Sequence, residues 1–121
     1  MSFRVFPYEP VEVFPTQLGL IVLQSDETVE QDFRRLFGPE VELQFTRIRS
    51  GADVTPETLA AMEGDLGASA ELLCPWTRFA AVGYGCTSGT AQIGRAQVAA
   101  LVSGGAQTRA VTEPVSALLA A

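Results

Sequence analysis

Hydrophobic residues gather in short runs that are typical of buried β-strands. Leu18–Leu23 (LGLIVL) and Phe79–Tyr84 (FAAVGY) are almost continuously apolar, as strands are when helices cover both faces of a parallel sheet. Val41–Ile48 (VELQFTRI) instead alternates apolar and polar residues, which predicts a half-exposed strand at the edge of the sheet. Gln107–Val111 is a weaker candidate for a fourth strand.

Between these runs, apolar residues recur at helical spacing. The first predicted helix follows Ser25 and Asp26, either of which can cap its N-terminus, and Gly38 with Pro39 ends it. The other predicted helices begin at Pro56, span Ala91–Val102, and span Pro114–Ala121. The positions expected to face the core of the first two helices are Val29, Phe33, Leu36 and Phe37, then Leu59, Met62, Leu66, Ala70 and Leu73.

The resulting order, β-α-β-α-β-α-β-α, predicts parallel strands joined by right-handed crossovers. We therefore expect an α/β fold, a small doubly wound parallel sheet of the flavodoxin-like type. In such a sheet the reactive site lies beyond the carboxyl ends of the strands, where the strand order reverses. Two predicted loops qualify, Gln24–Thr28 after the first strand and Gly85–Thr90 after the third.

The amino-acid composition limits the partners and catalytic groups that this chain can have. All eight basic residues are Arg, neither Lys nor His occurs, and the formal net charge is -6. Clustered positive charge is missing, which argues against nucleic acid as a partner. No segment has the pattern of a membrane span or a signal peptide, and two cysteines are too few for a disulfide scaffold, so we expect a cytoplasmic protein. A histidine-based triad, a histidine metal site and a lysine Schiff base cannot be built from this chain.

The most informative stretch is Gly83–Thr90 (GYGCTSGT), where a buried strand leads into small residues and then a helix. Glycine allows close approach of a ligand, and the start of a helix offers unpaired N–H groups to an anion. Cys86 lies there with the hydroxyl groups of Thr87 and Ser88 beside it. The stretch therefore predicts an anion pocket that holds a nucleophile or base, since the thiolate is the reactive form of cysteine.

Plainer interpretations stay open for both cysteines. A free cysteine is most often a small buried hydrophobe, and a turn rich in Gly and Ser can simply be a tight connection. Cys74 precedes Pro75 at a predicted helix end, outside any glycine-rich loop, and we expect it to be structural. Without histidine, the spacing of Cys74 and Cys86 does not make a metal site. A cysteine phosphatase fits less well, because Gln92 stands where that loop needs Arg. A Walker loop also fits less well, because it needs a Lys and the chain has none.

Several segments together resemble a known family. They are Leu18–Leu23, Ser25–Glu30 (SDETVE), Phe45–Ile48 (FTRI), Val54–Glu57 (VTPE) and Gly83–Gly89 (GYGCTSG). Their sequence and order resemble maleate cis-trans isomerases and arylmalonate decarboxylases of the aspartate/glutamate racemase superfamily. The resemblance runs over nearly the whole chain from Leu18 onward.

This resemblance implies two similar α/β domains with the active site in the cleft between them, no cofactor, and a small carboxylate or dicarboxylate as substrate. Residues 1–17 would be an extended arm and residues 18–112 the first, catalytic half-domain. Residues 113–121 would begin the crossover to a second domain, because Val111–Val115 resembles that crossing. The second domain, or a partner copy in a homo-oligomer, would complete the cleft.

The resemblance also assigns residues. Cys86 matches the cysteine of the first domain, and we expect it at the cleft surface, where removing its sulfur opens no large cavity. Thr87 and Ser88 match residues that help bind a substrate carboxylate. Ser25 and Asp26 stand where the family usually has an asparagine that contacts substrate. A carboxylate facing a dicarboxylate is repulsive unless protonated or turned away, so Asp26 is either a substrate-binding residue or a plain helix cap.

The leading hypothesis is thus a cofactor-independent isomerase or racemase that acts next to a carboxylate through the Cys86 thiolate. Thr87, Ser88 and nearby N–H groups would hold the carboxylate as negative charge develops. Two alternatives remain: a non-catalytic, small-anion-binding flavodoxin-like domain, and an arylmalonate decarboxylase-like lyase. The family's decarboxylases keep only the second-domain cysteine, so a cysteine at position 86 disfavours the lyase.

Overall fold

Four parallel strands form the centre of the molecule in the order β2-β1-β3-β4. The computed structural model describes all residues, 1–121. The elements in chain order are β1 (Thr16–Leu23), α1 (Val29–Leu36), β2 (Val41–Ile48), α2 (Pro56–Glu71), β3 (Ala81–Tyr84), α3 (Thr87–Ile93), α4 (Arg95–Gly105), β4 (Val111–Thr112) and α5 (Pro114–Ala120). This strand order is that of the first four strands of a flavodoxin-like sheet. The predicted fold class is confirmed, as is the edge position of β2.

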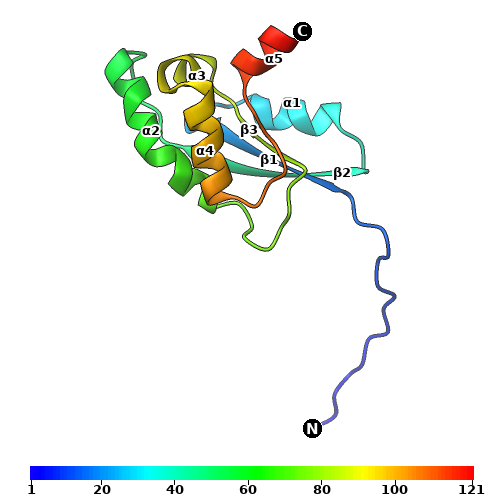
Figure 1. The fold of residues 1–121 in the computed structure, drawn as a ribbon. Coiled ribbons are helices and arrows are strands. Elements are labelled where there is room, and N and C mark those ends of the chain that lie inside the picture. The colour runs from blue at the N-terminus through cyan, green and yellow to red at the C-terminus, as the bar shows by residue number, and fades with distance from the viewer.

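The two faces of the sheet are covered differently, as Figure 1 shows. The chain moves from β1 to β2 in one direction and from β2 to β3 and β4 in the other, so right-handed crossovers place α1 on one face and α2 to α4 on the opposite face. Alternate residues of β1 follow this division. Ile21 packs in the core with α2 and α4, whereas Leu18 and Leu20 face α1.

The core lies mainly on the α2 and α4 face. Its buried members include Met62 and Leu66 of α2, as expected, together with Val98 and Val102 of α4. Helix α2 starts at a capping box, in which the Thr55 hydroxyl accepts from the Thr58 amide and the Thr58 hydroxyl accepts from the Thr55 amide. On the other face, α1 buries none of its residues completely, and Leu36 is exposed rather than core-facing.

Register brings two loops together at the carboxyl edge of the sheet. Strand β1 pairs with β3 so that Ile21 lies opposite Tyr84, and the Gly85 amide donates to the Ile21 carbonyl at 2.8 Å. The chain reverses its direction across the sheet between these two strands. The loops after β1 and β3 therefore start side by side at the switch point, which is where doubly wound sheets bind ligands.

The structure corrects several predicted boundaries. The expected helix at Ala91–Val102 is two helices, α3 and α4, which meet at Gly94 with a φ of +98°. A left-handed residue cannot continue a right-handed helix, and glycine adopts that conformation without strain. The N-cap of α1 is Thr28, not Ser25 or Asp26. The fourth strand is shorter and later than expected, at Val111–Thr112, with one bridge from Phe79 to Thr108 before it.

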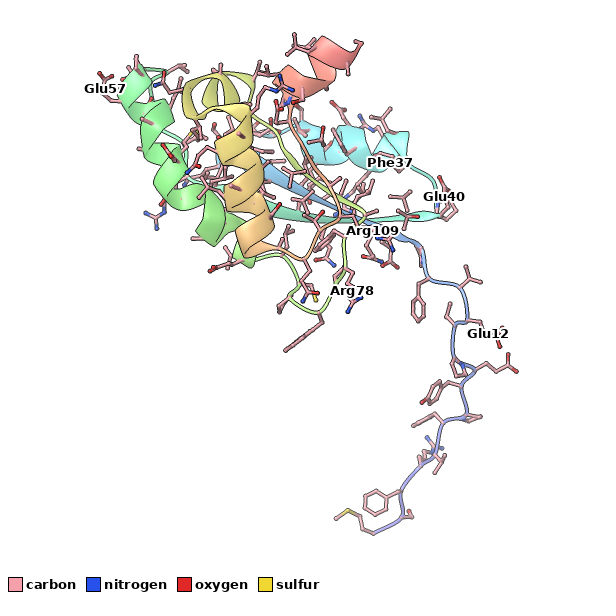
Figure 2. All side chains as sticks on the ribbon, in the orientation of Figure 1. Glu12, Phe37, Glu40, Glu57, Arg78 and Arg109 are labelled. Atoms are coloured by element: carbon pink, nitrogen blue, oxygen red, sulfur yellow. The ribbon has the colours of Figure 1, made fainter.

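The N-terminal arm, residues 1–15, contains no helix or strand and extends away from the sheet. Figure 2 shows its side chains, including Glu12, standing clear of the rest of the molecule. The arm exposes eight large hydrophobic residues: Met1, Phe3, Val5, Phe6, Tyr8, Val11, Val13 and Phe14. Strand β1 begins at Thr16, two residues before the apolar run that predicted it.

Candidate active site

Cys86 lies at the junction between β3 and α3, at the switch point of the sheet. It is the N-cap residue of α3 with extended backbone angles, and its Sγ accepts a hydrogen bond from the Gly89 amide at 3.2 Å. The Ser88 Oγ lies 3.8 Å from the same sulfur. The chain thus directs one backbone N–H group at the thiol and places a hydroxyl group above it.

Burial of Cys86 corrects an expectation from the sequence. The residue is only 6% exposed and belongs to the hydrophobic core, not to an open cleft surface. Its carbonyl is also held, by the Thr90 amide at 3.1 Å and by the Thr90 hydroxyl at 2.7 Å. Thr90 is itself fully buried. The thiol therefore lies in the packed core, beside the solvent-exposed Ser88.

Glycine is required at position 89 for a steric reason. A Cβ there would lie 2.6 Å from the Tyr84 hydroxyl oxygen and 2.9 Å from Cys86 Sγ, closer than non-bonded atoms approach. The absence of a side chain lets the Gly89 amide reach the sulfur. The GYGCTSG pattern thus has a packing cause that the sequence alone did not disclose.

Thr87 and Ser88 are exposed in the first turn of α3, so their hydroxyl groups are open to a ligand that approaches the carboxyl edge of the sheet. The first amides of a helix have no intrahelical partner, which adds N–H donors at the same place. Arginine is absent from this turn. Arg78 and Arg109 lie at the opposite, amino-terminal edge of the sheet (Figure 2). Within this turn, the donors open to an anion are hydroxyl and amide groups.

In the loop after β1, the Asp26 side chain hydrogen-bonds to backbone amides that follow it in the chain. Asp26 Oδ1 accepts from the Thr28 amide at 2.9 Å and the Val29 amide at 2.8 Å, so this carboxylate closes the start of α1 although Thr28 holds the N-cap position. Ser25 shares a hydrogen bond of 3.2 Å with Ser50. No hydrogen bond joins Ser25 or Asp26 to Cys86, although the two loops begin on paired strands.

Arg47 is a residue of this region that sequence reasoning missed. Its Nη1 donates to the carbonyl of Leu23 at 2.9 Å and that of Asp26 at 2.8 Å, and its Nη2 lies 3.6 Å from Glu30 Oε2. These bonds tie β2 to the loop after β1. The pairing of β1 with β2 is the feature that points to this role of Arg47, because it places Arg47 opposite Val22, near the end of β1.

Cys74 lies elsewhere, half-buried in the turn after α2. Its amide donates to Gln44 Oε1 at 3.0 Å. A hydrogen bond with the Thr77 side chain, followed by one with the Trp76 amide, lowers the pKa of the Cys74 thiol from its ordinary value. No group of three or more His, Cys, Asp or Glu residues is arranged to hold a metal ion. No helix combines the length and apolar character needed to cross a membrane.

A hollow of about 420 Å³ lies on the other face of the sheet, between α1 and α5. Its lining is mostly apolar and includes Leu18, Leu20, Val29, Phe33 and Phe37. Neither Cys86, Thr87 nor Ser88 contributes to it. This apolar hollow and the candidate thiol site are therefore different places, and the candidate site consists of the thiol and its donors at the switch point.

A doubly wound sheet with a buried cysteine at its switch point defines the class of protein, an α/β domain of flavodoxin-like topology. Within this class the chain is similar to the maleate isomerase Iso from Pseudomonas putida S16, with a TM-score of 0.68 and 25% sequence identity over 88% of this chain. A cysteine-to-alanine variant of that enzyme, solved with maleate, gives a TM-score of 0.64 at 24% identity, which bears on the fold alone.

The likeness shows that this chain shares the fold of part of a maleate isomerase. The chain matches 48% of the length of either solved chain, so it spans about half of those proteins. No protein-family model matches the sequence, and no curated protein matches it either.

Proposed function

We propose that this chain is the thiol-bearing half of a cofactor-independent isomerase that acts on a small unsaturated dicarboxylate, with Cys86 as the nucleophile. The observation that carries the proposal is Cys86 Sγ at the switch point, with the Gly89 amide directed at it from 3.2 Å. Similarity to a maleate isomerase over 88% of the chain supports the substrate class.

The proposed reaction needs no redox partner and no net proton transfer. The Cys86 thiolate adds to one carbon of the cis double bond and forms a C–S bond. The π electron pair moves to the neighbouring carbon and is delocalised into the carboxylate attached to it. The former double bond is now single and rotates. The electron pair then returns to form the trans double bond, the C–S bond breaks, and the thiolate is restored.

Negative charge grows on the substrate carboxylate in this intermediate, so donors there stabilise it more than the ground state. We assign this role to the Thr87 and Ser88 hydroxyl groups, because both are exposed within two residues of the thiol. Ser25 and Asp26 remain weaker candidates for substrate contact. The Asp26 carboxylate is occupied by two amides of its own loop, which favours its role as a helix cap.

We further infer that a second domain, or a second copy of this chain, closes the cleft over Cys86. The similar maleate isomerase chains are about twice as long as the matched region. Water exclusion strengthens every electrostatic contact that the mechanism uses. A thiol on the opposing face would also allow the related proton-transfer reaction, in which one thiolate removes an α-proton and the other thiol returns one.

The test uses the longer protein in which this chain is joined to its second half. We expect it to convert maleate to fumarate, followed by proton NMR, and we expect Cys86→Ser to lower kcat about a thousandfold or more. Cys74→Ser is the matched control and should retain turnover, because Cys74 lies in the turn after α2.

Two other results would favour the alternatives. Release of carbon dioxide from arylmalonates without isomerisation would indicate the lyase. Binding of dicarboxylates without any turnover, unchanged by Cys86→Ser, would indicate the non-catalytic anion-binding domain.

A further inference from the structure

Tyr84 is a buried polar residue that the proposed reaction does not use. It ends β3 and is 1% exposed, with its side chain on the α2 face of the sheet. Its hydroxyl group donates to Met62 Sδ at 3.8 Å. A thioether sulfur is a weak acceptor, and buried hydroxyl groups normally have stronger partners. The Tyr84 hydroxyl therefore has hydrogen-bonding capacity to spare.

This unused hydrogen-bonding capacity of Tyr84 lies close to the candidate nucleophile, Cys86. Tyr84 and Cys86 are two residues apart at the end of a strand, so their side chains leave the backbone on the same side. Both the Tyr84 hydroxyl oxygen and Cys86 Sγ crowd the same face of Gly89, at 2.6 Å and 2.9 Å from the position that a Cβ would take. Glycine at this position leaves the room that both the phenol and the thiol occupy.

The surroundings of Tyr84 keep its phenol protonated, so the hydroxyl group remains a hydrogen-bond donor. Burial first, and then the charge of Cys86 and a hydrogen bond with its side chain, raise the pKa of Tyr84 above its ordinary value. The phenol thus keeps its proton throughout the pH range in which a thiol ionises.

Other charged groups lie away from this pair. Helices α2 and α4 pack apolar residues into the shared core, and the only other buried titratable residue, Glu113, is held by Arg95 and Ser116. The acidic residues of α2 are exposed or half-buried: Glu57, Glu63, Asp65 and Glu71. Charge near the thiol therefore comes from the thiol itself, and the Gly89 amide is the backbone donor directed at it.

We propose that the Tyr84 hydroxyl turns from Met62 Sδ to Cys86 Sγ when the thiol ionises, so that Tyr84 positions and stabilises the thiolate from inside the protein. The hydroxyl proton rotates about the C–O bond and stays on the phenol throughout. Together with the Gly89 amide at 3.2 Å, it gives the thiolate two donors on the side away from solvent. This role rests on the proposed function, in which that thiolate attacks the substrate.

The first test compares Tyr84→Phe with its parent in a Cys74→Ser background, where Cys86 is the single thiol. Iodoacetamide alkylation is measured across pH, together with thiolate absorbance at 240 nm. A hydrogen bond to a charged group is worth more than one to a neutral group, so Tyr84→Phe should slow alkylation at neutral pH about tenfold. The pH profile should move upward, with the same rate at high pH. Met62→Leu is the control, because it removes the acceptor used only by the neutral state; it should therefore not raise the profile, and any shift should be downward, opposite to that of Tyr84→Phe.

A second measurement needs no substitution at position 84. The chain has two tyrosines, so carbon-13 labelling of the ring Cζ atoms gives two NMR signals, from Tyr8 and Tyr84. The Tyr84 signal should shift at the pH where Cys86 ionises, and Cys86→Ala should abolish that shift. A Tyr84 signal that ignores thiol ionisation, or a folded Tyr84→Phe with an unchanged alkylation profile, would overturn the proposal. Both tests read the thiol and not turnover, so a complete protein without isomerase activity would end the proposed function and leave this result standing.

Discussion

The two cysteines differ in what surrounds each sulfur. Cys86 is 6% exposed and packed against the core, whereas Cys74 is half-buried in a turn beside the exposed Trp76. Access and local hydrogen bonds govern how fast a thiol reacts. The residue with the proposed catalytic role is therefore not the one that a general thiol reagent meets first.

We expect iodoacetamide to modify Cys74 before Cys86 at neutral pH. Thr77, through its side chain, and then the Trp76 amide lower the pKa of Cys74 from its ordinary value, so a larger share of it is thiolate at neutral pH than without these hydrogen bonds. Peptide mass spectrometry of a time course from pH 6 to 9 gives both rates. Thr77→Val should slow the Cys74 reaction and leave Cys86 unchanged. Faster modification of Cys86 in the wild-type chain would show that the loop opens more readily than its burial indicates.

A single methyl group at position 89 should disturb the site more than its size suggests. Gly89→Ala places a Cβ against both the Tyr84 hydroxyl and Cys86 Sγ, and overpacking of this kind costs about 1–3 kcal/mol. We expect a lower melting temperature, together with loss of turnover in the longer protein. Gly64→Ala is the matched control. Nothing lies within 4 Å of a Cβ at that exposed helical position, so alanine should stabilise the chain by about 0.5–1 kcal/mol. Equal melting temperatures for the two variants would contradict the steric account.

At the level of elements, hydrophobic periodicity predicted the strands, the parallel topology and most helices. It missed the break at Gly94, because a glycine inside a helical pattern does not show whether its φ is positive. It correctly placed the Cys86 loop at the carboxyl edge of the sheet, because the position of this loop depends only on strand order. It could not show that Cys86 is buried, since burial arises when Tyr84, Met62 and Gly89 meet from three different elements. Arg47 escaped notice for the same reason.

Helix α5 is attached through Glu113, its N-cap residue. The Glu113 carboxylate accepts from the Ser116 amide at 2.9 Å and also hydrogen-bonds to the Ser116 hydroxyl. Arg95, at the start of α4, lies 3.6 Å from the same carboxylate and donates to Ser116 Oγ at 2.8 Å. These groups link α4 to α5.

This linkage should make the α5 attachment sensitive to acid. Burial acts to raise the pKa of Glu113, but the hydrogen bonds from Ser116 and Val115 and the charge of Arg95 together lower it. A carboxyl whose folded pKa lies below its unfolded value, about 4.3 for Glu, stabilises the fold above that value and loses this contribution as pH falls through the folded pKa. We expect wild type to be more stable than Glu113→Gln at pH 7, and the difference to shrink below about pH 4.3.

Urea unfolding of the two proteins at pH 7 and pH 3.5 measures this difference. Comparing variants cancels the other carboxylates, which titrate in both. Glu57→Gln is the control, since Glu57 is exposed at the start of α2, far from α5 (Figure 2). A stability difference between wild type and Glu113→Gln that is the same at both pH values would rule out a stabilising ionised Glu113.

On the scale of the whole molecule, one side of the sheet is packed and the other is partly uncovered. The α2 and α4 face holds the hydrophobic core. The α1 and α5 face keeps an apolar hollow of about 420 Å³, and the arm of residues 1–15 exposes further hydrophobic side chains. Exposed apolar surface of this kind favours association between copies of a chain. Light scattering must therefore accompany any assay of the chain by itself.

The 121-residue chain alone should fold but not catalyse. Its parallel sheet and the α2–α4 layer bury a core that does not depend on another domain, so we expect a helix-containing circular dichroism spectrum and a cooperative thermal transition. Turnover needs more than this core provides. The proposed intermediate requires donors in a site closed from water, while Thr87 and Ser88 are exposed to solvent. Maleate isomerisation, followed by NMR, should therefore be undetectable for a chain that light scattering shows to be monomeric.

A symmetric dimer could set two copies of Cys86 across a shared cleft, so activity that rises with the square of concentration would point to a partner copy as the missing half. Turnover proportional to the concentration of a demonstrated monomer would show instead that one domain suffices, and the inferred second half would have to be abandoned.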